Sequence, residues 1–122
     1  MVWAVTLILL CPRALSFWHD NVAAKLLDYG IDATWNDNNE FDIKDTDAVA
    51  NGFKDGSVKA SRIRPILTYL MVASSYSAQT EKYPGKRPFL STRSGSSAVR
   101  RLATTCRVTI LHHFTTCVIA IT

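Results

Sequence analysis

The chain has 122 residues, of which 14 are Lys or Arg and 10 are Asp or Glu, giving a formal net charge of +4. This length is enough for one small domain. The basic excess lies mainly in residues 87–107 and residues 28–55 are acidic, but neither stretch contains a recognisable nucleic-acid-binding module. We therefore expect the basic stretch to be solvated surface, and we expect no nucleic-acid partner. Cys11, Cys106 and Cys117 are too few and too widely spaced for a disulfide framework.

The first ten residues are almost entirely apolar. A helix needs about 20 apolar residues to cross a bilayer, so this segment is too short and membrane insertion is not expected. It is compatible with the apolar part of a signal peptide, with Ala14 and Ser16 as the small residues before a cleavage site. Against a signal peptide, no Lys or Arg precedes the apolar run. Secretion follows only if residues 1–16 are such a signal; otherwise the chain is expected in the cytoplasm.

Residues 14–29 have the pattern of an amphipathic helix, because apolar side chains recur at three- and four-residue steps. These side chains are Leu15, Trp18, Val22 and Leu26. Gly30 is suited to end the helix, and a strand is expected from Ile31. His19 stands among charged residues of this helix, so we interpret it as a surface residue rather than a ligand or a base.

The strand from Ile31 ends in a cluster of acids and amides. Asp37 is the first residue expected to leave the strand and face a ligand. Further polar groups surround it at Asn36, Asn38, Asn39 and Glu40. Chemistry is found at such strand ends in αβ barrels, because the loops lie over the barrel mouth while the strands hold them in place. From the residues alone, the alternative is a polar turn closed by Asx hydrogen bonds. A calcium loop is disfavoured because Phe41 stands where a ligand is needed and the required glycine is missing.

A second helix and strand follow. Residues 41–57 are acidic and contain two glycines, which predicts a long loop, either over the site or as a solvated excursion. Residues 61–79 are expected to be helical, with Ser61 as the N-cap and Pro65 in the first turn. The side expected to pack inward consists of Ile63, Leu67, Leu70, Met71 and Ser74. Residues 88–92 are expected to form the next strand, and Arg93 at its end is the second site candidate.

Two blocks of sequence carry a family resemblance. Residues 35–40, Trp-Asn-Asp-Asn-Asn-Glu, resemble the nucleophile signature W-x-D-x-N-E of the family-31 glycoside hydrolases, the α-glucosidase and α-xylosidase family. Met often stands in that family at the position of Asn38. Residues 87–94, Arg-Pro-Phe-Leu-Ser-Thr-Arg-Ser, resemble the family's next barrel strand, in the family's order and at a plausible spacing. The similarity runs from about Ala14 to Ala103.

This resemblance implies an α/β fold, namely a fragment of a (β/α)8 TIM barrel with about two βα units. A complete barrel typically needs about 250 residues, so this chain is too short to close one. We therefore divide the chain into an apolar segment at residues 1–13, signal-like or foreign, a barrel fragment at residues 14–105, and an apolar tail at residues 106–122.

The resemblance assigns Asp37 as the nucleophile of a hydrolysis that retains the anomeric configuration. Arg93 falls at the place of a sugar-binding arginine, and its cation would favour the ionised form of Asp37. From the residues alone, a salt bridge or a surface charge is the alternative for Arg93. Asp32 and Trp35, on the strand, are further substrate-binding candidates, with Asp32 expected in the barrel interior.

Asn39 and Glu40 are expected to support the nucleophile loop rather than to act on the substrate. Glu40 lies three positions after Asp37 on the same loop, from where it does not readily reach the opposite side of a glycosidic oxygen. In the family, an Arg-Tyr-Ala run leads to a Trp and then to a Gly-Asp pair whose Asp is the general acid/base. Aligned without gaps, Cys106 falls at the Trp and Thr109 at the acid. The chain is therefore predicted to lack catalytic activity of its own.

No cofactor and no metal are expected. A zinc site is disfavoured because the spacing of Cys106, His112, His113 and Cys117 matches no common zinc-binding pattern. The expected partner is a carbohydrate with terminal α-linked glucose or xylose, and the oligomeric state is left open. Two alternatives remain: a catalytically silent sugar-binding fragment, and a small secreted or membrane-attached interaction protein.

Overall fold

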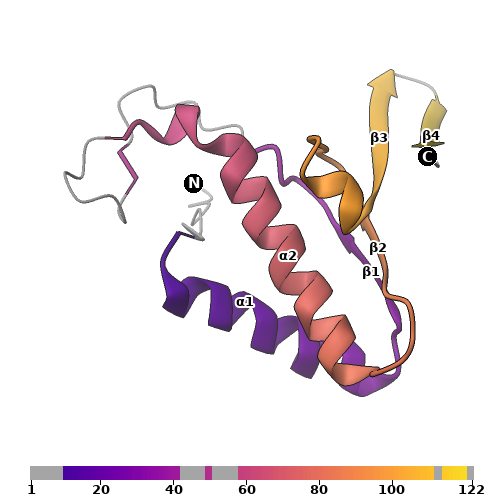
Figure 1. Cartoon of the computed structure of the whole chain (residues 1–122). Coiled ribbons are helices and arrows are strands. Elements are labelled where there is room, and N and C mark those ends of the chain that lie inside the picture. The colour runs from indigo at the N-terminus through magenta and orange to yellow at the C-terminus, as the bar shows by residue number, and fades with distance from the viewer. Residues whose placement is uncertain (1–9, 42–48, 51–57, 112–113, 121–122) are drawn as a thin grey trace, which may run out of the picture.

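The computed structural model describes residues 10–41, 49–50, 58–111 and 114–120. Within these ranges the chain forms two helices, three short 3₁₀ turns and one sheet (Figure 1). The elements are α1 (Pro12–Lys25), η1 (Leu27–Tyr29), β1 (Ala33–Asn36), η2 (Ala60–Arg62), α2 (Arg64–Lys82), β2 (Phe89–Thr92), η3 (Val99–Arg101), β3 (Thr104–Leu111) and β4 (Phe114–Ala120).

The strands lie in the order β1-β2-β3-β4. β1 and β2 run parallel, with Ala33 opposite Phe89 and Asn36 opposite Thr92. β3 joins them in parallel only at its start, and β4 folds back antiparallel on β3. Because α2 connects two neighbouring parallel strands, β1, α2 and β2 form a βαβ unit. The predicted α/β fold with parallel strands is confirmed.

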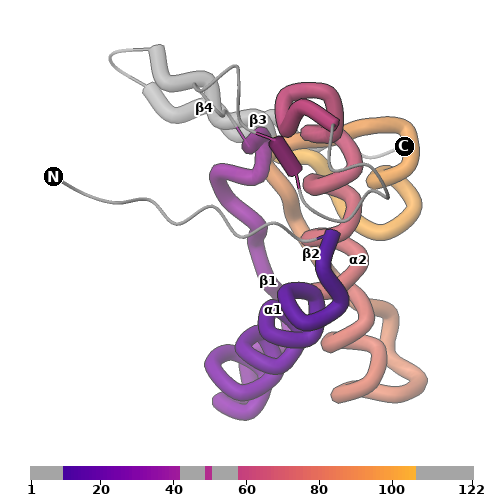
Figure 2. Tube along the Cα trace, turned by 90° about the vertical axis from the view of Figure 1, so that its left-hand side faces the viewer, coloured from indigo at the N-terminus to yellow at the C-terminus, as the bar shows by residue number. Residues whose placement is uncertain are grey.

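The helices form two layers against this sheet. α2 packs on β1 and β2, and α1 packs along α2, so α2 lies between α1 and the strands in Figure 1. In Figure 2, seen from the left-hand side of Figure 1, α1 lies in front. Among the described residues, neither helix is both long enough and apolar enough to cross a membrane.

The first helix begins two residues earlier than predicted, with Pro12 in its first turn, where a missing N–H has no cost. It ends at Lys25, and η1 continues the chain as a tighter turn. Gly30 then adopts a left-handed conformation, with φ of 84°, and its N–H donates to the carbonyl of Leu27 at 3.0 Å. Gly30 therefore ends η1, because glycine adopts this conformation without steric cost, but the predicted end of the α-helix at Gly30 was wrong, since α1 already ends at Lys25.

The predicted start of the second helix was wrong. Ser61 lies in η2 and does not cap α2; the N-cap position belongs to Ile63, which has no side-chain cap hydrogen bond. The preceding 3₁₀ turn supplies the backbone transition that a capping side chain would otherwise make. Pro65 does lie in the first turn of α2, as predicted.

The apolar core lies on both sides of α2. One cluster, where α2 meets α1, contains Ile63, Leu67 and Met71 among its buried members, so the predicted inward side of this helix is largely confirmed. A second cluster joins Val72 of α2 to Leu90 of β2 and Val99 of η3. These contacts fix the position of α2 over the sheet.

The opposite face of the sheet is uncovered in the described part of the chain. Side chains alternate along β1 and β2, so that Thr34 and Leu90 are buried while Trp35 and Phe89 remain 51% and 57% exposed. In a closed barrel of parallel strands, this face would point into the interior. β1 is also an edge strand of the described sheet. Both features fit a barrel fragment.

An ion pair near the C-terminal end of α2 predicts a small effect of alkaline pH. Lys82 Nζ lies 2.6 Å from Asp28 Oδ1, and this hydrogen bond, followed by the carboxylate's charge, raises the pKa of Lys82 above 10.5. Because the pKa is raised in the folded state, the pair's stabilisation is complete below pH 10.5 and is lost as the pH rises through the folded-state pKa. Lys82→Met should therefore flatten the alkaline end of a Tm-against-pH curve. Lys25→Met on α1 is the control, and an equal flattening there would contradict the assignment.

Candidate functional site

The carboxyl ends of β1 and β2 are joined one residue beyond the regular strands. The backbone N–H of Arg93 donates to the carbonyl of Asn36 at 3.0 Å. This bond extends the parallel ladder, and it brings Asp37 and Arg93 together although 56 positions separate them in the sequence. The two leading site candidates therefore meet at one edge of the sheet, as expected for the carboxyl ends of neighbouring parallel strands.

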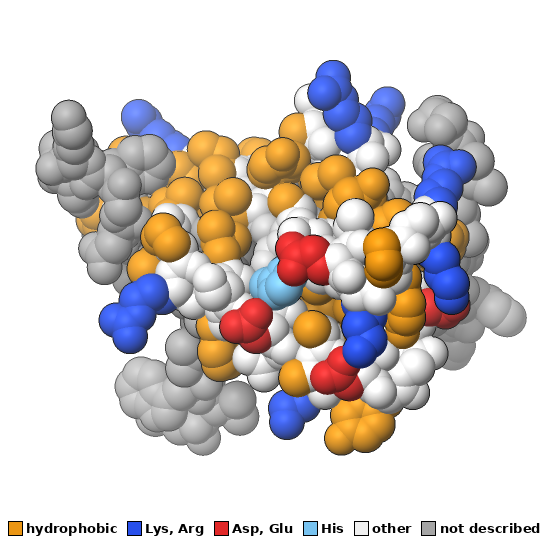
Figure 3. All heavy atoms as spheres, turned by 60° about the horizontal axis from the view of Figure 1, so that its bottom comes forward, with side chains coloured by type: hydrophobic (Ala, Val, Ile, Leu, Met, Phe, Trp, Pro, Cys, Tyr) orange, Lys and Arg blue, Asp and Glu red, His pale blue; other side chains and the backbone are white. Residues whose placement is uncertain are grey.

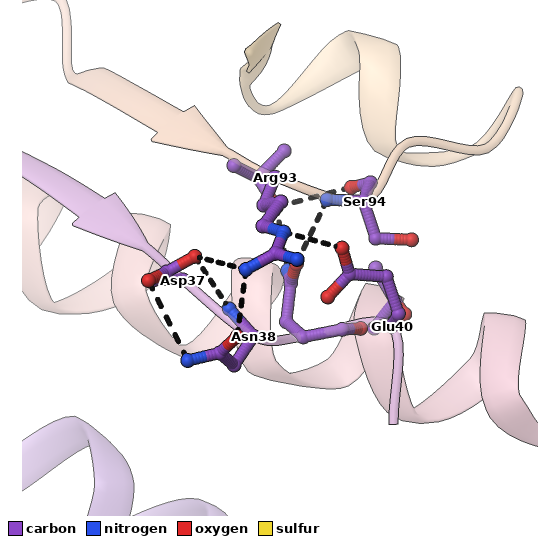
Figure 4. Close-up of polar contacts among 8 residues, drawn as sticks. Asp37, Asn38, Glu40, Arg93 and Ser94 are labelled. Carbon is purple, nitrogen blue, oxygen red and sulfur yellow. Dashed lines mark hydrogen bonds and ion pairs between the residues drawn. The ribbon is translucent and has the colours of Figure 1, made fainter. Parts of the chain in front are cut away.

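The guanidinium of Arg93 lies between two carboxylates (Figure 4). Its Nη1 contacts Asp37 Oδ1 at 3.2 Å and donates to Asn38 Oδ1 at 2.7 Å, while its Nε lies 2.7 Å from Glu40 Oε1. The side chains of Asp37 and Glu40 are 40% and 41% exposed, and that of Arg93 is 27% exposed. The cluster is therefore open to a ligand from solvent while its geometry is fixed by charged hydrogen bonds.

The loop that carries Asp37 contains two unusual backbone conformations. Asn38 has φ of 52° and Phe41 has φ of 50°. Asparagine tolerates this left-handed region, but it is strained for a bulky residue such as Phe41. The ring of Phe41 packs against the core cluster of Leu67 and Met71, which holds the strained residue in place. The N–H of Asn38 donates to Asp37 Oδ1 at 2.8 Å, so the turn also fixes the carboxylate.

Asn39 is the buried anchor of this loop, with no exposed surface. Its Nδ2 donates to Thr92 Oγ1 at 2.5 Å, and its Oδ1 accepts the backbone N–H of Ser94 at 2.9 Å. Its own carbonyl accepts the hydroxyl proton of Thr68 at 2.6 Å. The loop is thereby attached both to the end of β2 and to α2.

The two remaining substrate-binding candidates, Trp35 and Asp32, lie at different distances from Asp37. Trp35 lies on the uncovered face of β1, two residues before Asp37, so the two side chains leave the chain on the same side. Asp32 is exposed and precedes β1, at the opposite end of the strand. Five residues of extended chain span about 16 Å, so the structure does not bring Asp32 together with Asp37 and Arg93.

Sequence reasoning missed the polar side chains that α2 directs toward the strands. Gln79 Nε2 donates to Thr34 Oγ1 at 2.7 Å, and Ser75 Oγ donates to Asn36 Oδ1 at 3.2 Å. Together with Thr68, these helix residues are almost fully buried. Their spacing of seven and four residues places them on one side of α2, a signal that was available in the sequence.

The only histidine in the described part of the chain lies away from this cluster, in a groove of about 400 Å³ lined by residues of α1 and α2. His19 Nδ1 lies 3.0 Å from Asp20 Oδ1, and its Nε2 approaches Glu81 Oε2 at 3.2 Å without hydrogen-bond geometry. Figure 3 shows this pale blue side chain between acidic ones at the surface. The site candidates on β1 and β2 do not line this groove.

The described part of the chain contains no group of three or more His, Cys, Asp or Glu residues that could hold a metal ion. Cys106 is disulfide-bonded, whereas Cys11 is a free thiol. His112 and His113 lie outside the described residues.

A family model described as the TIM-barrel domain of glycosyl hydrolases family 31 matches residues 4–106. Alpha-glucosidase 2 of Bacillus thermoamyloliquefaciens is 35% identical over 81 residues, which is 62% of this chain and 10% of that protein. The chain thus spans about a tenth of the length of this relative. No solved structure matches.

The matched range extends to both sides of the predicted fragment at residues 14–105. The division of the chain after residue 13 and after residue 105 therefore stays a prediction. The match covers both strands that carry the Asp37–Arg93 pair, and the parallel βαβ unit agrees with it. The chain belongs to glycosyl hydrolase family 31, and its fold is a part of that family's TIM-barrel domain.

Proposed function

We propose that this segment carries the nucleophile of a retaining α-glycosidase, Asp37, and that the substrate is a terminal α-linked glucose or xylose. The observation that carries the proposal is the pair of Asp37 and Arg93, in contact at 3.2 Å where the carboxyl ends of two parallel strands meet. Substrate sites of αβ barrels are built at this end of the strands.

The contacts of Asp37 suit a nucleophile. Attack on the anomeric carbon requires a negatively charged carboxylate, and both Arg93 and the N–H of Asn38 contact the Asp37 carboxylate. The attack breaks the glycosidic bond and forms a covalent glycosyl-enzyme, the leaving oxygen departs as an alcohol with a proton from the acid/base of the complete barrel, and water then hydrolyses the intermediate. Arg93 also has N–H groups that can donate to sugar hydroxyls, and Trp35 offers an aromatic surface on the same side of β1.

Glu40 is assigned to hold Arg93 rather than to act as the acid/base. Its carboxylate contacts Nε of Arg93, so it lies on the other side of the guanidinium from Asp37 (Figure 4). A retaining mechanism needs a second carboxyl group about 5 to 5.5 Å from the first, across the scissile bond. In the ungapped alignment that the resemblance suggests, Thr109 stands at the position of this acid. We therefore infer that the isolated chain does not hydrolyse glycosides.

A second candidate function, sugar binding without hydrolysis, is favoured by the partial exposure of the Asp37–Arg93 pair. Binding of deoxynojirimycin, measured by calorimetry, should weaken at least about tenfold in Arg93→Met, because one charged hydrogen-bond donor is lost. Arg87→Met, before β2 and at its far end, should bind as the unchanged chain does. Equal binding by both variants would contradict the site.

Hydrolysis is measured in parallel with p-nitrophenyl α-glucoside. We expect no turnover by the unchanged chain. Turnover that disappears in Asp37→Ala would overturn the inference that the chain is inactive, while supporting Asp37 as the nucleophile.

A further inference from the structure

The hydroxyl of Thr68 is buried and makes its shortest contact with the loop that carries Asp37. Thr68 lies in α2 and is 2% exposed. Its Oγ1 lies 2.6 Å from the carbonyl oxygen of Asn39 and 3.1 Å from that of Arg64, one turn earlier in the helix. A hydroxyl has only one proton to donate, and the shorter distance indicates that this proton is directed mainly to the carbonyl of Asn39. This bond connects α2 to a loop that is 29 positions away in the sequence.

Asn39 connects α2 to the end of β2, next to Arg93. Its side chain is held by Thr92 and Ser94 at the end of β2, next to Arg93. Its backbone is held by Thr68, so the residue is fixed by two separate elements. Asn38, in a left-handed conformation, is the single residue between Asn39 and Asp37. With Asn39 fixed, this short link sets the direction of the Asp37 carboxylate.

The hydroxyl of Thr68, and not only its volume, matters at this position. Valine has nearly the same shape, and burial of a hydroxyl is unfavourable unless the hydroxyl is hydrogen-bonded. Removal of the hydroxyl would leave the carbonyl of Asn39 buried without its partner from α2. The hydrogen bond rather than the volume is therefore the feature that distinguishes Thr68 from an ordinary core residue.

We propose that Thr68 is a positioning residue of the glycosidase site, which acts through Asn39 to hold Asp37 and Arg93 in their common geometry. The inference rests on the proposed function of Asp37. It adds a residue of the helix layer to a site that otherwise belongs to the ends of two strands.

The test is a comparison of three variants of the full chain by NMR. The signals are the backbone N–H of Ser94, which donates to Asn39 Oδ1, and the side-chain Nε–H of Arg93, whose nitrogen lies 2.7 Å from Glu40 Oε1 in an ion pair. In Thr68→Val, exchange of both protons with water should be at least about tenfold faster, because the loop opens more often. In Thr68→Ser, which keeps the hydroxyl, both rates should stay within about twofold of the unchanged chain.

Thr80→Val is the matched control. Thr80 lies on the same helix, and its Oγ1 donates to the carbonyl of Tyr76, one turn earlier, at 2.9 Å, but it is exposed. Both rates should be unchanged in this variant. The proposal is overturned if the exchange rates in Thr68→Val equal those in Thr80→Val, or if those in Thr68→Ser equal those in Thr68→Val. It is also overturned if the Arg93 Nε–H of the unchanged chain is not protected from exchange. A lower Tm with unchanged exchange would mean that Thr68 is only structural.

This experiment uses no substrate, so its failure is distinct from failure of the proposed function. If Asp37 is not a nucleophile, its replacement leaves hydrolysis unchanged in an intact barrel. If Thr68 does not position the loop, the exchange rates are unchanged whatever Asp37 does.

Discussion

Replacement of Asp37 by alanine should lower glycoside hydrolysis by about 10⁴-fold or more once a complete barrel surrounds this segment. The barrel can be supplied by transplanting residues 14–105 into a complete relative, such as alpha-glucosidase 2 of Bacillus thermoamyloliquefaciens, in place of the corresponding part of its barrel. On the proposed function, the rest of the barrel supplies the acid/base and the other strands. Asp37→Ala in this chimera then removes only the nucleophile. The measurement is kcat/KM for p-nitrophenyl α-glucoside.

Asp32→Ala is the matched control in the same chimera, because it removes a carboxylate from the other end of β1. We expect a change of less than about threefold, since this side chain lies about 16 Å along the chain from the reacting group. Equal losses in the two variants would show that the strand rather than the carboxylate matters. A chimera that is active and insensitive to Asp37→Ala would remove the nucleophile assignment.

The arrangement of Asp37 and Arg93 was predictable because it depends on regular structure. An apolar stripe predicts a helix, alternation predicts a strand, and the carboxyl ends of neighbouring parallel strands meet. Once both strands were located, the approach of two side chains separated by 56 positions followed from topology alone. Grouping Asp32 with them was less sound, because neighbours in sequence lie far apart along an extended strand.

The support of the loop was not predictable in the same way. Asn39 was expected to support the nucleophile, but its partners Thr68, Thr92 and Ser94 come from segments between 29 and 55 positions away. A single sequence shows that Thr68 lies on the same side of its helix as Ser75 and Gln79. It does not show which carbonyl or amide each of them meets, because that depends on how α2 is rotated against the sheet. The mistaken cap at Ser61 has a similar cause, since backbone turns compete with side-chain caps at helix ends.

Replacement of Asn39 by alanine should have the largest effect on stability among the site residues. The side chain is completely buried and makes two hydrogen bonds, to Thr92 Oγ1 and from the N–H of Ser94. Alanine leaves that N–H without its acceptor and leaves a cavity between the loop and β2. We expect a loss of about 3 kcal/mol in the free energy of unfolding, which is a large share of the stability of a small domain. Urea unfolding followed by tryptophan fluorescence measures it.

Asn21→Ala separates this effect from the general loss of an amide. Asn21 is exposed on α1, and its Nδ2 donates to the carbonyl of Phe17 at 2.8 Å, so its removal should cost less than about 0.5 kcal/mol. If both variants lose the same small amount, Asn39 is not the anchor of the loop, and the arrangement of Asp37 must be maintained by its contacts with Arg93 and the N–H of Asn38. If Asn39→Ala instead unfolds the chain near room temperature, the loop is part of the core. In that case the strain at Phe41 is balanced by the same hydrogen bonds that fix the carboxylate, which makes the site inseparable from the fold.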